Sequence, residues 1–433
     1  MNKKLWIVMS LLVVAAMMLA ACGGEATPTE AAEVPTDVME PEEPTDVPEE
    51  PTEPAEGQII TIWHQWSGDY LDAITQAFAD YEAANPGVNI VLDVPEDVSN
   101  ALDVAIPAGE GPDIIGWAND QIGAQALVGN IVPLEEYGVD MAMLESIYTE
   151  PGVVGVVWND TIWGLPETME GIAMLYNMDL VTDEYLPADP MDFEDLYNKA
   201  VKFQEDTGNV LICNQGFGAN DAYHVAPVYF GHGVPSYVDD QGNAYLNTPE
   251  AMAAGDWLAK IAEVSLAENS HELCLANISD GSVGLWWSGP WAINSLEENG
   301  VNYGIAPMGS PFVGIKVMML SKNAVDRGNT ELAIDIMKYF TSPEVQKALA
   351  LVNKTIPAQT AAIEDPEVQA LATLAGFGKA LSLGTPMSNS PFSSAQWDPV
   401  GNASAAIYTG AQEVEEALNA AQAAIEEAIA QMQ

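Results

Sequence analysis

The strongest constraint on the fold is a regular alternation of short apolar runs and helix-like stripes that begins at residue 59. The β-branched run Ile59-Ile60-Thr61-Ile62-Trp63 predicts a strand. The next apolar residues recur at helical spacing and predict an amphipathic helix; they are Leu71, Ile74, Phe78 and Tyr81. The sequence Asn85-Pro86-Gly87 ends this helix, because proline and glycine both disfavour its continuation. Residues 88–94 then predict a second strand.

A third strand and further helices extend the same pattern. A short helix through Leu102 and Ile106 leads to a third apolar run at residues 112–117. The order is therefore βαβαβ, and the runs are apolar enough to predict strands covered on both faces, as in a doubly wound α/β sheet. Residues 332–340 and 414–432 carry further helical stripes.

Length and charge narrow the class of protein. The residues from Gln58 to Gln433 are too many for one ordinary core and predict two lobes. This part of the chain has no run of about 18 apolar residues, so we expect no membrane span in it. The formal net charge is −52, and after Lys4 no Lys or Arg occurs before Lys199. The negative electrostatic field of such a chain disfavours binding to nucleic acid and to anionic membrane surfaces. An anionic small ligand would need a site where the local charge is not negative.

The N-terminus has the pattern of a lipoprotein signal peptide. Two lysines precede an apolar run that ends in Leu19-Ala20-Ala21-Cys22. We therefore expect residues 1–21 to be removed and Cys22 to be acylated, which would anchor the chain to the cell membrane, on its outer face or in the periplasm. Residues 22–57, rich in Pro, Thr and Glu and without basic or aromatic residues, predict a disordered acidic linker. The alternative is a plain secretory signal with an incidental cysteine.

Metal, nucleotide and serine-hydrolase motifs are absent from the sequence. The four histidines form neither H-x-x-x-H nor H-E-x-x-H, so no metal site is predicted. No G-x-x-x-x-G-K-[ST] or G-x-S-x-G sequence occurs, and no cofactor is expected. Besides Cys22 the chain has Cys213 and Cys274. In an oxidising compartment they either form one disulfide or remain free thiols, since spacing alone does not decide.

Several blocks of sequence, in order, resemble the extracellular solute-binding proteins (family 1) of ABC importers, in particular the maltose/maltodextrin-binding branch. The resemblance covers most of the chain after residue 57, and its later blocks are the most specific. The blocks are residues 58–90, 112–134 and 164–180, then Gly289-Pro290-Trp291-Ala292 with Val301-Asn302-Tyr303-Gly304-Ile305, and then Pro311-Phe312-Val313-Gly314 with the helix through Ile334 and Tyr339.

The resemblance implies a two-lobed α/β fold of the type II-like periplasmic-binding-protein kind. Each lobe would be a doubly wound sheet with flanking helices, and the ligand cleft would lie at the hinge. The implied N-lobe is residues 58–166 and 319–365, and the implied C-lobe is residues 167–318 and 366–433. Such a protein is expected to be a monomer and not an enzyme. It would capture a carbohydrate, such as a maltodextrin-like oligosaccharide, by hinge closure and deliver it to permease subunits that a separate ATPase drives.

The resemblance also implies seven ligand-binding residues, and Gln65 and Trp66, where the sequence departs from the family, are two further candidate contacts. Sugar recognition requires flat apolar faces for the C–H side of a pyranose ring and polar side chains for its hydroxyl rim. The expected stacking platforms are Trp291, Trp397 and Tyr223, and the other expected contacts are Asp221, Trp117, Asp120, Glu170, Trp66 and Gln65. The alternatives are core packing for the tryptophans and a solvated or hinge-stabilising role for Asp120 and Glu170. The sequence does not decide whether the following tryptophans line the cleft or pack in the core: Trp63, Trp66, Trp158, Trp163, Trp286 and Trp287.

Two departures from the maltodextrin pattern bear on specificity. The sequence His64-Gln65-Trp66-Ser67-Gly68-Asp69 stands where the family usually carries an Asp-Lys pair, and Gln121 stands where an Arg usually follows the Asp. Two cationic hydroxyl donors are therefore missing, which leaves another oligosaccharide or a monosaccharide as alternatives to maltose. Two further interpretations stay open: the same fold with a polyamine or peptide as cargo, and a secreted glycoside hydrolase with paired carboxylates.

Overall fold

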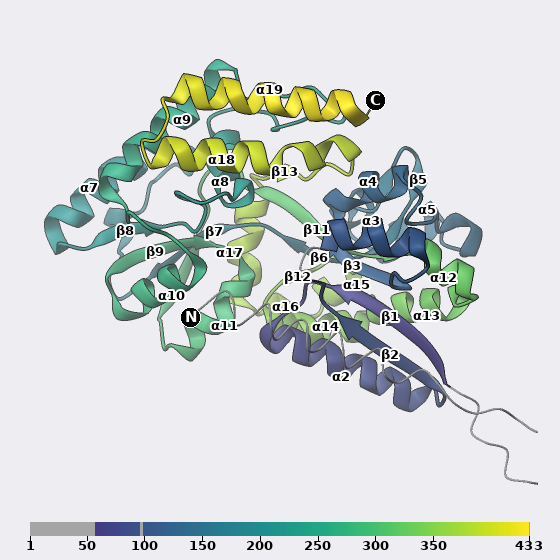
Figure 1. The fold of residues 1–433 in the computed structure, drawn as a ribbon. Coiled ribbons are helices and arrows are strands. Elements are labelled where there is room, and N and C mark those ends of the chain that lie inside the picture. The colour runs from purple at the N-terminus through teal and green to yellow at the C-terminus, as the bar shows by residue number, and fades with distance from the viewer. Residues whose placement is uncertain (1–56, 96–97, 433) are drawn as a thin grey trace, which may run out of the picture. The chain divides into compact units, whose positions relative to one another are not determined.

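The computed structural model describes residues 57–95 and 98–432, and the fold it shows is organised around two sheets (Figure 1). The expected signal peptide, the acylation site Cys22 and nearly all of the acidic linker lie outside the described residues. No helix within the described ranges is long and apolar enough to cross a bilayer.

The first sheet is mixed and contains the three strands that the opening pattern predicts. Its strands, in spatial order, are β12 (Ile356–Pro357), β6 (Gly164–Glu170), β11 (Phe312–Leu320), β3 (Ile114–Ala118), β1 (Gln58–His64) and β2 (Val88–Asp93), with β13 (Thr385–Pro386) on β11. Strand β1 pairs in parallel with β2 and β3, whereas β11 runs antiparallel to β3 and β6. The prediction that each opening strand is covered on both faces is wrong for β2, because this edge strand alternates half-buried and exposed residues.

The second sheet has four strands and is also mixed. They are β10 (Tyr303–Ala306), β7 (Ala173–Asn177), β9 (Val283–Ser288) and β8 (Val210–Cys213). Only β8 and β9 are parallel. A separate two-stranded hairpin joins β4 (Val157–Trp158) to β5 (Thr161–Ile162).

Helices cover both sheets, as an α/β fold requires. Around the first sheet lie α2 (Gly68–Ala84), α3 (Val98–Ala108), α4 (Ile122–Leu127), α5 (Met141–Ile147), α6 (Glu150–Val154), α12 (Lys322–Arg327), α13 (Thr330–Phe340), α14 (Pro343–Asn353), α15 (Thr360–Ile363) and α16 (Pro366–Gln369). Around the second lie α7 (Phe193–Thr207), α8 (Ala222–Gly231), α9 (Pro249–Ile261), α10 (His271–Asp280), α11 (Ile293–Glu298), α17 (Ala372–Leu381), α18 (Trp397–Tyr408) and α19 (Val414–Met432). Helices α18 and α19 lie side by side over the second sheet's helices (Figure 1).

Short 3-10 helices occupy several of the connections. They are η1 (Asn119–Gln121), η2 (Glu135–Tyr137), η3 (Asp183–Tyr185), η4 (Ala262–Val264), η5 (Pro290–Ala292) and η6 (Pro391–Ala395).

Local sequence explains where the elements stop. Helix α2 buries the predicted stripe on one face and ends at Asn85, and Gly87 follows with a φ of +97° that side chains rarely adopt. Helix α7 begins at an Asp192 cap and ends at Gly208, whose φ is +77°. Capping residues and left-handed glycines thus set the helix lengths.

The second sheet separates two cores, which resolves the roles of two tryptophans. Trp286 and Trp287 are adjacent on β9, and both are fully buried. Because successive strand residues point to opposite faces, Trp286 joins the core that continues under the first sheet, while Trp287 joins the core beneath α7, α8 and α9. Both are core residues.

The chain passes between the sheets at short connections. It leaves the first sheet after β6, crosses at Gly171 and Ile172, and enters β7. It returns between β10 and β11 through residues 307–311. These two connections fix how strands of the two sheets are placed at their shared boundary.

A third connection, residues 387–396, is tied to the first sheet by a buried polar network. The amide nitrogen of Asn119 donates to the Met387 carbonyl at 2.9 Å and to the Asn389 side chain at 2.6 Å. Its oxygen accepts the Ile315 N–H at 2.9 Å. Because Asn119 is fully buried, these bonds satisfy groups that would otherwise be costly to bury.

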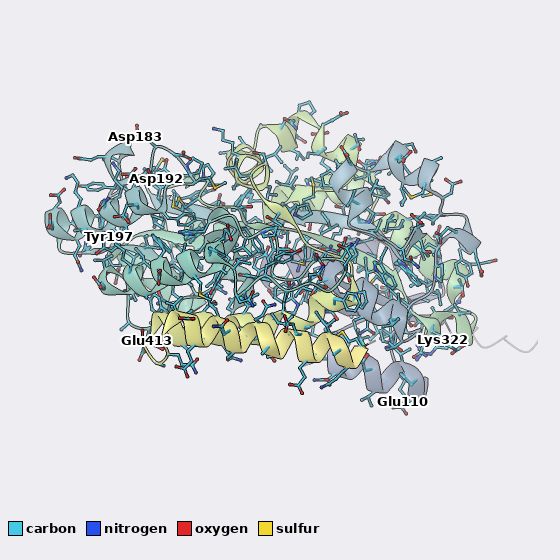
Figure 2. The ribbon with its side chains drawn as sticks, turned by 90° about the horizontal axis from the view of Figure 1, so that it is seen from above. Glu110, Asp183, Asp192, Tyr197, Lys322 and Glu413 are labelled. Carbon is cyan, nitrogen blue, oxygen red and sulfur yellow. A yellow bond between two sulfur atoms is a disulfide. The ribbon has the colours of Figure 1, made fainter. Side chains whose placement is uncertain are left out.

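Many acidic side chains lie at the outside of the protein. Figure 2 looks onto α19 and labels exposed carboxylates at both ends of the view, among them Asp183 and Asp192 near α7, Glu413 before α19, and Glu110 near the opposite end. The carboxylates labelled there are exposed to solvent.

The two cysteines form a disulfide, which answers a question that the sequence left open. Cys213 ends β8 and Cys274 lies on α10, with their Cα atoms 5.5 Å apart. The bond therefore attaches α10 to the edge of the second sheet.

Replacing both cysteines by serine (C213S with C274S) is expected to lower the free energy of unfolding by about 4 kcal/mol, because the disulfide closes a loop with a sequence separation of 61. Urea unfolding followed by circular dichroism measures the change. Reduced wild-type protein is the control, and equal midpoints for the oxidised wild type and the double variant would contradict the prediction.

Candidate ligand-binding cleft

Two adjoining cavities lie where the two sheets meet. Their volumes are about 430 Å³ and about 350 Å³. Both are lined by Gln65, Glu170, Trp291 and Lys316, so they form one continuous cleft. Glu170 ends β6 and Lys316 lies within β11, which places both residues beside the connections between the sheets.

The first cavity has many polar side chains in its wall. One side is the segment 65–70, which joins β1 to the start of α2. The opposite side comes from α10 and α11, and the lining there consists of His271, Asn294, Ser295 and Glu298. Burial lowers the pKa of His271, so this imidazole is neutral at physiological pH. The wall thus offers amide, hydroxyl and carboxylate groups for hydrogen bonding.

The second cavity is lined by aromatic rings from both sides of the cleft. They are Trp117, Tyr223, Trp291 and Trp397. The centroid of the Tyr223 ring lies 6.3 Å from that of Trp291, and Tyr223 also stacks on Phe312 with an interplanar angle of 14°. These contacts hold the rings in place and leave flat apolar faces along the cavity.

Trp291 depends on a glycine two residues before it. A Cβ atom built on Gly289 would lie 2.2 Å from the Trp291 ring. Only glycine therefore allows the indole to fold back over its own backbone, and this explains the Gly-Pro-Trp order of the block. The indole is half-buried and lines both cavities.

Asp120 is a buried carboxyl of η1 that also accepts a hydrogen bond from α18. Its Oδ2 accepts the Trp397 indole N–H at 3.1 Å and the Gln121 amide at 3.3 Å. Burial raises the pKa of Asp120 to about 6, although the bonds from Gln121 and Trp397 and the charge of Lys316 each oppose the rise. The carboxylate is therefore the main form at neutral pH.

Lys316 is a cleft residue that the sequence analysis missed. Its ammonium lies 3.6 Å from Glu170 Oε2, and the two side chains are 21% and 12% exposed. Among the described residues that line the cleft, it is the only Lys or Arg. A signal was present, since this lysine interrupts an apolar strand directly after the Pro311–Gly314 block. Lys316 supplies a cationic donor to the cleft, whereas the segment 64–69 and Gln121 lack the cationic residues that the family usually carries there.

Trp66 is largely a core residue with one edge on the first cavity. Its side chain is 5% exposed and stacks on His64, with ring centroids 4.7 Å apart. Its ring also contacts Phe340. The neighbouring Gln65 lines both cavities, and its buried Nε2 has no hydrogen-bond partner in the described structure. That amide is available to a ligand.

The structure does not bring Asp221 to the cleft. Its carboxylate caps α8 by accepting the His224 N–H at 3.0 Å, and it lies 2.8 Å from His224 Nδ1. Neither cavity is lined by it. The other eight expected residues do line the cleft. Of the tryptophans left open, Trp158 and Trp163 pack against each other, and neither they nor Trp63 line either cavity.

No metal centre is evident in the part of the chain that the structure describes. Its His, Cys, Asp and Glu side chains form no group able to hold an ion.

Comparison with known proteins gives one family. A sequence model described as bacterial extracellular solute-binding protein matches residues 76–376. A maltotriose-binding protein of Pyrococcus abyssi is 28% identical over 367 residues, which cover 81% of this chain and 77% of that protein. A galactooligosaccharide-binding protein of Bacillus subtilis is 24% identical over 335 residues, covering 73% of this chain and 76% of the other.

Solved structures agree with the fold. The maltose/maltodextrin-binding domain of Bdellovibrio bacteriovorus, bound to maltotriose, superposes with a TM-score of 0.76 at 21% identity, covering 86% of this chain and all of that one. The maltotriose-binding protein of Thermus thermophilus gives 0.72 at 20% identity, with coverage of 86% and 100%. These likenesses establish the two-lobed periplasmic-binding-protein fold.

Replacing Trp397 by phenylalanine is expected to raise the pKa of Asp120 above its value of about 6, because the indole N–H bond that favours the carboxylate is lost. Carboxyl-carbon NMR titration measures the shift. Trp158→Phe is the control, since Trp158 does not line the cleft. An Asp120 pKa that stays the same or falls in Trp397→Phe would refute the assigned bond.

Proposed function

The chain belongs to the bacterial extracellular solute-binding proteins, and we propose that it captures a carbohydrate, a maltodextrin-like oligosaccharide, for an ABC importer. The aromatic cavity carries this proposal. Trp117, Trp291 and Trp397 present flat faces beside buried carboxyls, which is the combination that a sugar ring with its hydroxyl rim requires.

The size and mixed character of the cleft support the same ligand class. Both cavities fall within the range of roughly 300 to 1,000 Å³ that is typical of small-molecule sites. The aromatic cavity suits the C–H faces of the sugar, and the polar cavity beside it suits exposed hydroxyls. Relatives named for maltotriose and galactooligosaccharide agree with a ligand longer than one ring.

Within this proposal eight of the nine expected residues bind the sugar, and the ninth, Asp221, acts indirectly. Trp291, Trp397, Tyr223 and Trp117 stack, and the polar or edge contacts come from Gln65, Trp66, Asp120 and Glu170. Lys316 joins them as a donor. Asp221 orients α8, whose second residue is Tyr223.

Capture proceeds by closure of two lobes about the connections between the sheets. The N-lobe would comprise residues 58–166 and 319–365, and the C-lobe residues 167–318 and 366–433. The closed, monomeric protein would then be recognised by membrane permease subunits that a separate ATPase drives. Acylation of Cys22 would hold it near them, with the acidic linker as a tether.

We further propose that the protein is not an enzyme. A glycoside hydrolase places two carboxyls on either side of a bond that breaks, and its products carry new reducing ends. Here Glu170 is engaged by Lys316, and Asp120 by Trp397. Both carboxyls are thus already contacted by the protein's own side chains. Incubation with maltotriose should release no reducing ends.

A thermal-shift screen of the purified protein tests the ligand class. Ligand at 100 times its Kd stabilises the folded state by about 2.7 kcal/mol. We expect shifts with maltodextrins such as maltotriose and little dependence on salt, because a neutral ligand is not screened. Shifts only with polyamines or peptides would discard the carbohydrate while keeping the importer role.

Replacing Trp291 by alanine is expected to weaken maltotriose binding by about 1 to 3 kcal/mol, because a stacking face is removed from the centre of the cleft. Isothermal titration calorimetry measures the affinity. Trp158→Ala is the matched control and should change the melting temperature but leave the affinity as it is. An unchanged affinity in Trp291→Ala with a lower melting temperature would make Trp291 a packing residue.

A further inference from the structure

Glu167 is a buried carboxyl that lies behind the cleft and contacts one of its walls. It belongs to β6, and its side chain is 0% exposed. Its Oε1 accepts the Tyr70 hydroxyl at 2.5 Å, and its Oε2 accepts the Trp66 indole N–H at 3.3 Å. Both oxygens are thus occupied by donors from a single segment, residues 66–70.

That segment forms a wall of the first cavity. Residues 65–70 all line it, whereas Glu167 does not line either cavity. The same β6 strand ends at Glu170, which lines both. Glu167 therefore connects the wall formed by residues 65–70 to the strand that carries a cleft carboxylate, without reaching the ligand space itself.

The strand is irregular at this point. Ile315 pairs with Met169 and Val317 pairs with Pro166, so that two residues of β6, Glu167 and Thr168, stand opposite Lys316 alone. Such a β-bulge interrupts the regular alternation of side chains and redirects them. Here it occurs directly before the crossing to the second sheet, where the placement of β6 sets the shape of the cleft.

Few charged or titratable groups face Glu167. Tyr70 comes from α2, Glu170 from β6 itself, and Lys316 from β11. Burial and Glu167 hold the pKa of Tyr70 well above its usual value, so that hydroxyl remains a donor. The neighbouring His64 accepts the Trp66 backbone N–H through Nδ1 at 3.1 Å, and burial lowers its pKa, so it stays neutral.

The two protonation states of Glu167 hold the wall differently. A carboxylate offers acceptors to both the phenol and the indole, and both are donors. A carboxylic acid has a proton of its own on one oxygen, which weakens one of those two bonds. Burial raises the pKa of Glu167 to about 7, with Glu170 adding to the rise and Tyr70, Lys316 and Trp66 opposing it.

We propose that Glu167 is a positioning residue that holds the 65–70 wall of the cleft through its ionised carboxylate, so that ligand affinity is linked to its protonation. The inference rests on the proposed carbohydrate function for its ligand, but the link between Glu167 and the wall does not depend on that ligand. Binding that requires the ionised form favours loss of the proton. The affinity is therefore highest at pH values above the pKa that Glu167 has in the ligand-free protein, and it falls as the pH drops through that pKa.

The affinity for maltotriose, measured by calorimetry, tests the linkage at pH values above the Asp120 pKa of about 6. Between about pH 8.5 and about pH 6.5 we expect the wild-type affinity to fall roughly threefold, as it should when binding lowers a carboxyl pKa from about 7 by one unit. Glu167→Gln should bind more weakly at the higher pH and lose this pH dependence, because an amide cannot accept two hydrogen bonds on its two polar atoms.

Two further variants separate positioning from general destabilisation. Tyr70→Phe removes one donor and should reduce the pH dependence while the carboxyl is retained. Asp113→Asn is the matched control, since Asp113 is a similarly buried carboxyl, directly before β3, that accepts the Thr61 N–H and pairs with Arg327, outside the cleft. It should lower the melting temperature and leave the pH dependence of binding at the wild-type value.

The indole N–H resonance of Trp66, assigned with Trp66→Phe, tests the contact without any ligand. We expect it to titrate with a midpoint of about 7 in the wild type and not in Glu167→Gln. A resonance that does not titrate overturns the proposal, and so does a maltotriose affinity that is the same at both pH values. If the wild type binds no maltotriose at any pH, the carbohydrate proposal fails, and the Trp66 titration alone decides the role of Glu167.

Discussion

The cleft depends on the antiparallel pairing of β6 and β11. These two strands lie side by side in the first sheet, and each is joined by a short connection to a strand of the second. Gly314 pairs with Glu170, which brings that carboxylate beside Lys316 of the opposing strand. One strand pair therefore joins the sheets, carries the charged centre of the cleft and forms part of the expected hinge.

Electrostatics at this centre differ from those at the surface. The surface carboxylates are solvated and mainly set the large negative charge. In the cleft, Glu170 has an ammonium partner and Asp120 has an indole and an amide, and behind the cleft Glu167 has a phenol and an indole. Each buried carboxyl is thus bound by donors, as burial of a charge demands. Two of these donors are the indole N–H groups of Trp397 and Trp66, so the hydrogen bonds to the carboxyls also orient aromatic rings of the cleft.

The fold and most of the site were predictable from sequence for different reasons. The opening βαβαβ order followed from periodicity, because burial of one helix face or one strand face leaves a direct pattern in the residues. Trp291 and Asp120 came from resemblance, since no periodicity marks a ligand contact. The placement of Asp221 as a helix cap was not expected, because an aspartate before a helix suits both a cap and a ligand contact. Lys316 and Glu167 were missed, since each gains its partners only from strands or helices distant in the chain.

The sequence alone determined the order of strands and helices, the acidic charge and the blocks that identify the family, because these depend on local spacing and composition. The tertiary structure decided which of the tryptophans among the described residues face the cleft, that Cys213 meets Cys274, and that a β-bulge sets Glu167 against Tyr70. These outcomes depend on the register between β6 and β11 and on packing between segments that are from 61 to 277 residues apart. Local sequence patterns do not reveal contacts between segments so far apart in the chain, because the register of strand pairing decides which residues meet.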